Sequence, residues 1–173
     1  MVMAAPADRV RANTSVDDND SIDRRARMSV AYYAAAPHEI DARLQELDRE
    51  WDVERVLEAN ASTLALSGIL LGIGVSRKFL VIPALVAAFL LQHAVQGWCP
   101  PLPLLRRLGV RTRREIDAEK YALKALRGDF DRVDQRDPPS ARAAQALAGA
   151  AGDQRTNHRA PPRRPVGRRG RRE

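Results

Sequence analysis

The sequence predicts an all-α membrane protein: a two-span transmembrane helical hairpin flanked by amphipathic cytoplasmic helices, with disordered N- and C-terminal tails. Two long runs without a charged residue, 59–75 and 79–98, stand in the middle of a chain that is 29% charged. The mean hydropathy of −0.40 conceals this segregation, because the apolar residues are concentrated in those runs. A chain that is only 5% aromatic and so unevenly divided does not suggest a large soluble core.

The segment before the first run divides into two parts. Residues 1–37 mix Asp, Arg, Ala and Ser without a period, which predicts a disordered leader. Residues 38–58 are expected to form an amphipathic helix. The apolar residues that line one face of this helix, at steps of four, three and four, are Ile40, Leu44, Leu47 and Trp51.

Residues 59–98 are predicted to form the transmembrane hairpin, with spans at about 59–75 and 79–98. The first run has 17 residues and would rise about 25 Å as a helix, which is short for a hydrocarbon core of about 30 Å. The second has 20 residues, ten of them Leu, Ile, Val or Phe, and reaches the interface at Trp98. Since only residues 76–78 separate the runs, the two helices should be antiparallel neighbours.

Residues 99–130 are predicted to be a Pro-rich exit followed by an amphipathic helix. The prolines of "CPPLP" end the second span, because each lacks a backbone donor. Thr112 and Glu115 have the spacing of a capping box, and Gly128 can close the helix, whose apolar face would hold Ile116, Leu123 and Leu126. Residues 131–173 are rich in Ala, Arg and Pro, which predicts a disordered basic tail.

The cations beside the spans predict an orientation. Six of them lie between Pro100 and Lys120, and three lie on the preceding flank. By the positive-inside rule both termini should be cytoplasmic, in a bacterial inner membrane, although Arg77 and Lys78 then lie in a translocated turn. The alternative is a soluble helical hairpin buried in a larger partner.

Two glycines suggest how the spans pack. Gly68 and Gly72 form a GxxxG pattern, which allows close contact between helices in lipid. This face could pack against the second span or against a second copy of the chain, and the sequence does not decide between these. Glycine is also simply common in membrane helices.

The sequence points to no catalytic, metal or cofactor site. The chain has one cysteine and three scattered histidines, which give neither an intrachain disulfide nor a metal-ligand spacing. His93 could be a proton or metal site with Gln92 and Gln96, but a polar cluster near a helix end is more typical of an interfacial anchor. No small-molecule substrate can be identified, and no enzyme activity is predicted.

The C-terminal segment from Arg155 to Arg172 carries eight arginines and no aromatic residue. Its charge predicts contact with anionic lipid. Nucleic acid is less favoured, because single-stranded nucleic acid is usually bound with aromatic stacking as well as charge.

The stretch "GWCPPLPLLRRLGV" resembles the exit motif of the YgaP-like transmembrane family, which consists of small bacterial inner-membrane domains with two adjacent spans. The matching residues are Gly97, Trp98, Cys99, Pro100, Leu108, Gly109 and Val110. The resemblance implies a two-span fold, a membrane location and a homodimer through the hairpin. Some members carry a rhodanese domain, but Cys99 matches the membrane motif rather than a rhodanese loop, so sulfur transfer is not implied.

These observations predict a small integral inner-membrane protein that acts as a structural or interaction module. One alternative is a membrane-tethered adaptor that uses its arginine-rich tail to bind anionic lipid or nucleic acid. A weaker alternative is a thiol-dependent sulfur carrier through Cys99, if neighbouring arginines lower the pKa of its thiol.

Overall fold

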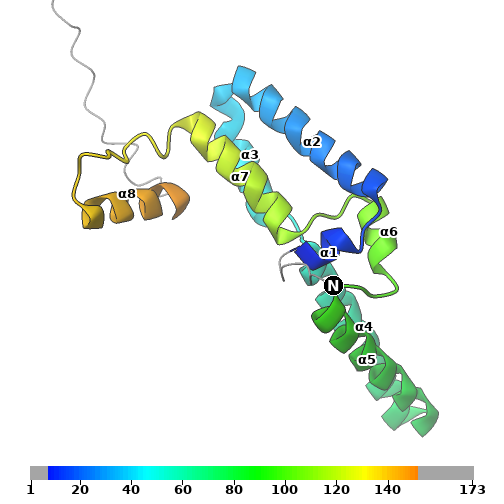
Figure 1. The fold of residues 1–173 in the computed structure, drawn as a ribbon. Helices are drawn as coiled ribbons and strands as arrows, with labels where there is room; N and C mark the ends of the chain where they lie inside the picture. The colour runs from blue at the N-terminus through cyan, green and yellow to red at the C-terminus, as the bar shows by residue number, and fades with distance from the viewer. Residues whose placement is uncertain (1–7, 152–173) are drawn as a thin grey trace, which may run out of the picture. The chain divides into compact units, whose positions relative to one another are not determined.

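The computed structural model describes residues 8–151, which form helices and their connections without a strand in that range (Figure 1). The chain divides into two compact units, one ending at Arg127 and the other beginning at Gly128. The first unit contains the hairpin and a group of helices beside it. The second contains one helix, and each unit is described by itself.

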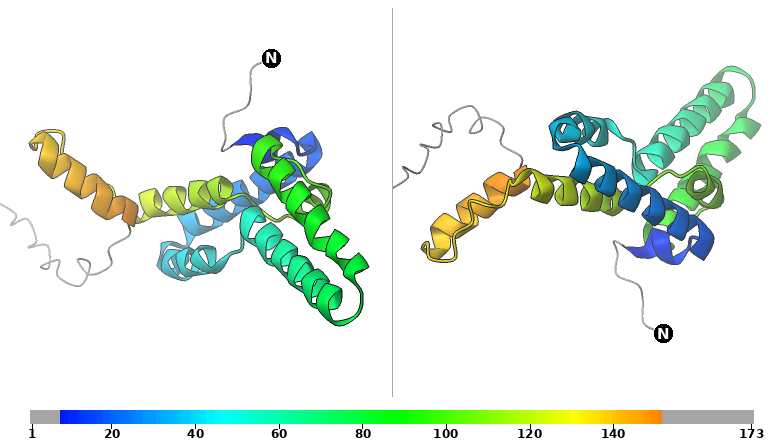
Figure 2. Two further views of the ribbon diagram at one scale, coloured as in Figure 1. Left: turned by 90° about the horizontal axis from the view of Figure 1, so that it is seen from below. Right: turned by 90° about the horizontal axis from the view of Figure 1, so that it is seen from above.

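The hairpin consists of α4 (Val53–Gly74) and α5 (Val81–Gln96), joined through the 3₁₀ turn η3 (Arg77–Leu80). The two helices lie side by side (Figures 1 and 2). Asp52 caps α4, because its side chain accepts a hydrogen bond from the Arg55 N–H at 2.8 Å. The helix therefore begins six residues before the predicted first span and runs into it without a break.

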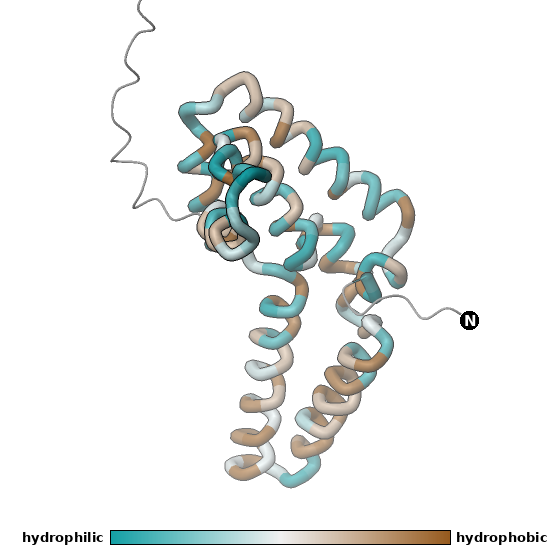
Figure 3. The backbone as a smooth tube through the Cα atoms, turned by 60° about the vertical axis from the view of Figure 1, so that its left-hand side comes forward, coloured by the Kyte–Doolittle hydropathy of each residue, from teal (hydrophilic) through white to brown (hydrophobic). Residues whose placement is uncertain are grey.

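Both hairpin helices are long and apolar enough to cross a membrane. In the most apolar stretch of the segment Arg77–Gln96 no residue is buried. In the most apolar stretch of the segment Pro37–Gly74, which includes α4, only 17% of the residues are buried. Hydrophobic residues predominate along α5 and in the part of α4 nearest the turn, whereas the beginning of α4 is mixed (Figure 3). The hairpin thus presents apolar side chains outward, unlike a core helix of a soluble protein.

The remaining helices of the first unit are called the head. They are α1 (Arg9–Ala12), α2 (Val16–Ala35), η2 (Pro37–Glu39), α3 (Ile40–Arg49), α6 (Leu102–Arg107) and α7 (Arg113–Arg127). One buried cluster joins α3 and α7 through Ile40, Leu44, Leu47, Ile116 and Leu123. A second joins α1, α4 and the chain after α5 through Val10, Val53, Leu57, Cys99 and Leu102.

The predicted disordered leader, residues 1–37, is wrong for the part that the structure describes. Helices α1 and α2 lie within it, and α2 begins at an N-cap where Ser15 Oγ accepts a hydrogen bond from the Asp18 N–H at 3.1 Å. Periodicity did not reveal α2, because Ile22 is its only buried residue. Val30 and Tyr33 pack partly buried against the cluster of α3 and α7, and polar side chains of α2 add hydrogen bonds to other helices. Residues 1–7 lie outside the described part of the chain.

The predicted helix over residues 38–58 is two helices. The chain becomes extended at Glu50 and Asp52, and the Val53 N–H donates to the Arg111 carbonyl at 2.9 Å. The predicted face is confirmed for Ile40, Leu44 and Leu47, which are buried, but Trp51 lies in the break and is 48% exposed. Its ring instead lies under the guanidinium of Arg55, 4.4 Å from the ring centroid.

The predicted helix after the proline-rich exit is confirmed as α7. The Thr112 N–H donates to Glu115 Oε2 at 2.8 Å, and Thr112 Oγ1 accepts from the Glu115 N–H at 3.3 Å, which is the expected capping box. Ile116 and Leu123 are buried as predicted, whereas Leu126 is 46% exposed. Gly128 follows the last turn with a φ of 84°, a conformation that favours glycine.

In the second unit, the predicted disordered tail at 131–173 is wrong over α8 (Pro139–Ala151). Gly149 of this helix packs so closely that a Cβ there would lie 2.7 Å from the Asp129 carbonyl oxygen and 2.9 Å from Phe130. Alanine-rich composition accounts for the helix, since alanine has the highest helix propensity. The arginine-rich segment 155–172 lies outside the described residues.

Candidate functional site at the base of the hairpin

The motif residues gather at the end of the hairpin where α4 begins and α5 ends, called the base. Gly97 closes α5 with a φ of 73°, and its N–H donates to the His93 carbonyl at 2.7 Å. A Cβ on Gly97 would lie 2.4 Å from Cβ of Arg9. The motif glycine is therefore required both by its backbone conformation and by the contact with α1.

Helix α1 caps the second hairpin helix from outside. Arg9 Nη1 donates to the carbonyls of Ala94 and Val95, each at 2.8 Å, and Asn13 Nδ2 donates to the Gln96 carbonyl at 3.0 Å. These carbonyls belong to the last turn of α5, where helical partners are missing. A guanidinium there also interacts favourably with the helix dipole.

Cys99 is a core residue. It is 3% exposed and packs with the second buried cluster, while its carbonyl accepts the Leu102 N–H at 3.0 Å. Burial raises the pKa of its thiol, and the backbone hydrogen bond with Leu102 only partly opposes this. The sequence hypothesis of a thiol activated by neighbouring arginines has no support in this environment. Trp98 packs partly buried beside it, and Pro100 is exposed.

The second half of the motif ends α6. Gly109 has a φ of 85° and donates its N–H to the Arg106 carbonyl at 2.9 Å. The Val110 N–H donates to the Leu105 carbonyl at 3.0 Å, and Val110 packs on the core, whereas Leu108 is 68% exposed. The motif as a whole thus marks two helix ends and the core between them.

Gly68 faces the second hairpin helix, and Gly72 faces Leu80 in the 3₁₀ turn that leads into it. A Cβ on Gly68 would lie 2.7 Å from Cδ of Pro83 and 2.9 Å from Cβ of Ile82. A Cβ on Gly72 would lie 2.5 Å from Cδ2 of Leu80. Of the two arrangements that the sequence left open, the structure shows the contact within the chain.

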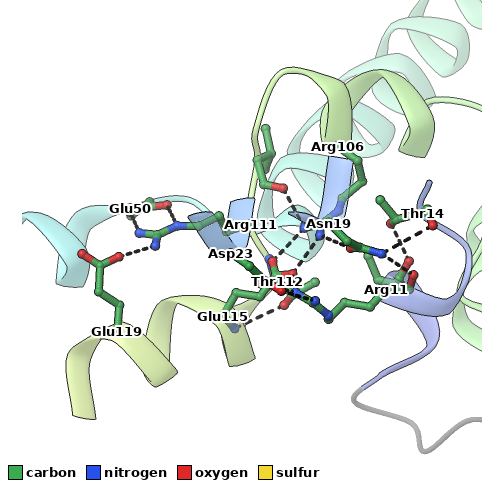
Figure 4. Close-up of polar contacts among 12 residues, drawn as sticks. Arg11, Thr14, Asn19, Asp23, Glu50, Arg106, Arg111, Thr112, Glu115 and Glu119 are labelled. Atoms are coloured by element: carbon green, nitrogen blue, oxygen red, sulfur yellow. Dashed lines mark hydrogen bonds and ion pairs between the residues drawn. The ribbon is translucent and has the colours of Figure 1, made fainter. Parts of the chain in front are cut away.

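A buried ion-pair network links the head helices (Figure 4). At its centre the fully buried Arg106 donates to Glu115 Oε2 at 2.7 Å and to Glu115 Oε1 at 2.8 Å. The same guanidinium donates to Asn19 Oδ1 and to the Val110 carbonyl, at 2.9 and 3.0 Å. Arg11 adds a hydrogen bond to Glu115 Oε1 at 2.5 Å. One carboxylate thus receives donors from α1, α6 and the cap of α7.

This environment keeps Glu115 ionised. Burial alone would raise the pKa of its carboxyl group, but the hydrogen bonds from Arg106 and the Thr112 N–H and the positive charges lower it to about 2. Paired and hydrogen-bonded charges are the form in which ionic groups are tolerated inside proteins, although Nε of Arg106 has no hydrogen-bond partner among the described residues.

In the second part of the network, two acids surround Arg111. Its guanidinium donates to Glu50 Oε1 at 2.7 Å and Oε2 at 2.5 Å, and also donates to Glu119. Glu119 is fully buried and accepts from Ser29 Oγ at 2.6 Å and from Arg43 Nε at 3.1 Å. Burial acts to raise the pKa of Glu119, but these donors lower it overall. The break between α3 and α4 is thereby fixed to α7.

Sequence reasoning counted Arg106 and Arg111 only as cations beside a membrane span and did not predict this network. A signal was present on the predicted helix 113–127. Glu115 and Glu119 share the face of Ile116 and Leu123, and an acid on an apolar face indicates a buried partner. The identity of the partners could not be read, because Arg11 lies 104 residues away from Glu115.

The base also contains a cavity of about 320 Å³, called the base cavity. Helix α4 contributes Leu57, Asn60, Ala61 and Leu64 to its walls, and α5 contributes Val86, Phe89, Leu90 and His93. The chain after α5 closes it with Cys99, Pro101 and Leu105. His93 therefore meets an apolar cavity in the structure, rather than forming a site with Gln92 and Gln96.

Within residues 8–151, no group of three or more His, Cys, Asp or Glu side chains could hold a metal ion. Comparison with known proteins finds no matching family, no matching curated protein and no matching solved structure. The resemblance to the YgaP-like family accordingly stays a prediction from the motif.

Proposed function

We propose that this chain is a small integral membrane protein whose hairpin anchors the head at a membrane surface, where the protein acts as a structural or interaction module. The observation that carries the proposal is the exposure of α5. This helix is the most apolar of the described part, yet none of its residues is buried. Such a surface would cost about 25 cal/mol per Å² in water, which lipid removes.

The packing of the head favours a hairpin that enters and leaves the membrane on the same side. Helices α1 to α3 precede the hairpin and α6 and α7 follow it, and the two groups pack together through Arg11–Glu115, Arg43–Glu119 and the buried cluster of α3 and α7. A single folded head requires both flanks on one face. By the positive-inside rule we place that face in the cytoplasm of a bacterium, beneath its inner membrane.

The ion pairs of the head bear on whether its cations can contact lipid headgroups. Five of the six cations between Pro100 and Lys120 are paired with acids in the structure, namely Arg106, Arg111, Arg113, Arg114 and Lys120. Arg106, Arg111 and Lys120 are largely buried, so their charge is used inside the head and is less available to lipid headgroups, whereas Arg113 and Arg114 pair at its surface. This supports a rigid module for protein contacts over one that adheres to lipid by these cations.

A homodimer through the hairpin belongs to the same proposal. Gly68 is covered by α5 and Gly72 by Leu80 of η3, so that a second copy would contact other faces of the hairpin. Exposed residues such as Leu70, Ile73 and Leu91 are available on those faces.

Alkaline carbonate extraction of bacterial membranes tests the anchoring. We expect the full chain to remain in the membrane pellet, and a reporter that is active only in the cytoplasm should give signal at either terminus. Release by carbonate would favour the soluble hairpin buried in a partner. Retention with signal at only one terminus would contradict the single head.

A further inference from the structure

The base cavity has features of a ligand site rather than of a packing defect. Its volume of about 320 Å³ falls within the range of small-molecule pockets, and an apolar cavity of about half this size is known to bind benzene. Of the eleven residues in its walls, eight have hydrocarbon side chains, and only Asn60, His93 and Cys99 carry a polar or reactive group. A ligand that fills it must therefore be largely hydrocarbon.

One polar atom at this cavity lacks a partner. His93 Nδ1 is buried and has no hydrogen-bond partner within the described part of the chain. Buried polar atoms are nearly always hydrogen-bonded to protein, water or ligand. Because the same residue lines the base cavity, its imidazole is the part of the wall best able to hydrogen-bond a polar group at one end of a ligand.

The position of the cavity along the hairpin indicates which kind of ligand it would bind. His93 lies in the last turn of α5, near the membrane interface in the proposed orientation, and Leu64 and Val86 lie farther along the hairpin. Val86 lies seven positions before His93 on the helix, a rise of about 10 Å. A chain that enters beside His93 and follows the cavity toward Val86 therefore has the orientation of a bilayer lipid, polar group at the interface and hydrocarbon toward the core.

We propose that the base cavity binds one acyl chain of a membrane lipid, with the polar end of that chain at His93. The binding is non-covalent. The proposal rests on the proposed membrane insertion, since a hairpin outside a bilayer would not meet such a lipid.

Photocrosslinking of the full chain in liposomes tests the proposal. The probe is a phosphatidylcholine with a diazirine at the middle of one acyl chain, diluted into phosphatidylglycerol and phosphatidylethanolamine. We expect crosslinks enriched at the partly buried cavity residues Ala61 and Val86 over the exposed residues Leu70 and Leu91. Equal crosslinking of both sets would overturn the proposal.

A matched pair of variants strengthens this experiment. Ala61→Phe places a ring in the cavity wall and should remove most of the crosslinks at Val86, whereas Ala88→Phe adds the same ring at an exposed position outside the cavity and should leave them unchanged. Unchanged crosslinking in Ala61→Phe, with helical content preserved by circular dichroism, would overturn the proposal.

A further variant keeps the test valid if Ala61→Phe does not fold. His93→Leu keeps the wall apolar but removes the imidazole, and native mass spectrometry should show that it loses a lipid which the unaltered chain retains in detergent. Equal retention would contradict the role of His93. If the chain is not inserted, it yields no crosslinks anywhere and is released by carbonate, which separates failure of anchoring from failure of the cavity.

Discussion

Arg106 on α6 and Glu115 on α7 face each other through two parallel hydrogen bonds of 2.7 and 2.8 Å in the interior of the head. Neither side chain is more than 8% exposed. The geometry is the bidentate form that makes arginine–carboxylate pairs strong and directional. Because each charge depends on the other for its solvation, this pair gives the first prediction.

Glu115→Ala should destabilise the head by about 3–5 kcal/mol, because it leaves Arg106 charged and buried without its main partner. Unfolding by urea in detergent micelles measures the change. Asp117→Ala is the matched control, since Asp117 pairs with Arg113 at the surface of the same helix and should cost only about 0.3–0.5 kcal/mol. Similar losses in both variants would show that the buried pair has no special role.

The stability of the head should fall in acid. The pKa of Glu115 is about 2 in the folded protein, below its ordinary value of 4.5, so the stabilisation is complete above about pH 5 and is lost as the pH falls toward 2. A difference of this size corresponds to about 3 kcal/mol. Thermal unfolding between pH 6 and pH 2 should show the loss, and Glu115→Gln should flatten the curve. An equally steep curve in that variant would assign the acid sensitivity to other groups.

Gly97→Ala should destabilise the base by at least about 1–2 kcal/mol, the cost of a left-handed conformation for a residue with a side chain. Contact with Arg9 adds to this cost. Gly74→Ala is the control, because a Cβ at Gly74 meets nothing within 4 Å. Thermal unfolding in detergent compares the two. If Gly97→Ala were as stable as Gly74→Ala, α1 would not be seated on the end of α5.

Gly68→Leu should separate the hairpin helices, because its side chain would collide with Pro83 and Ile82. We expect a lower unfolding temperature and altered mobility of the full chain in detergent gels. Gly74→Leu adds the same side chain in open space and should behave like the unaltered protein. Indistinguishable behaviour of both variants would favour a face that is free for a second copy.

Cys99 should react slowly with a membrane-permeant maleimide in the native protein. Its thiol is buried, and its raised pKa keeps the nucleophilic thiolate scarce at neutral pH. Labelling should accelerate strongly after denaturation in sodium dodecyl sulfate. Rapid labelling of native protein at pH 7 would restore the hypothesis of a reactive thiol.

Local features were predictable from the sequence. The hairpin followed from two runs without charge, and the start of α7 followed from the spacing of Thr112 and Glu115. These signals depend on neighbours a few residues apart. The buried face of α3 was predicted for the same reason, but its end was not, because Glu50 turns toward Arg111, 61 residues away.

Features held by distant polar contacts were not predictable in this way. Helix α2 contains one buried apolar residue, Ile22. Its Asp23 and Ser29 bond to the other helices of the head, through Arg11 and Glu119. Its other apolar contacts, Val30 and Tyr33, are only partly buried, so the apolar period of this helix is weak among its many charged residues. The base cavity was also missed, because its walls combine three separate segments of the chain.

Because the head combines segments from before and after the hairpin, its folding must follow the synthesis of the hairpin. During synthesis Arg11 emerges long before Glu115, and the whole hairpin is made between them. The first half of the head therefore has to wait until both apolar helices have left the ribosome before its partners on α6 and α7 exist. If the hairpin enters the membrane as it is made, the head folds last, and it can fold only after both helices have crossed the membrane.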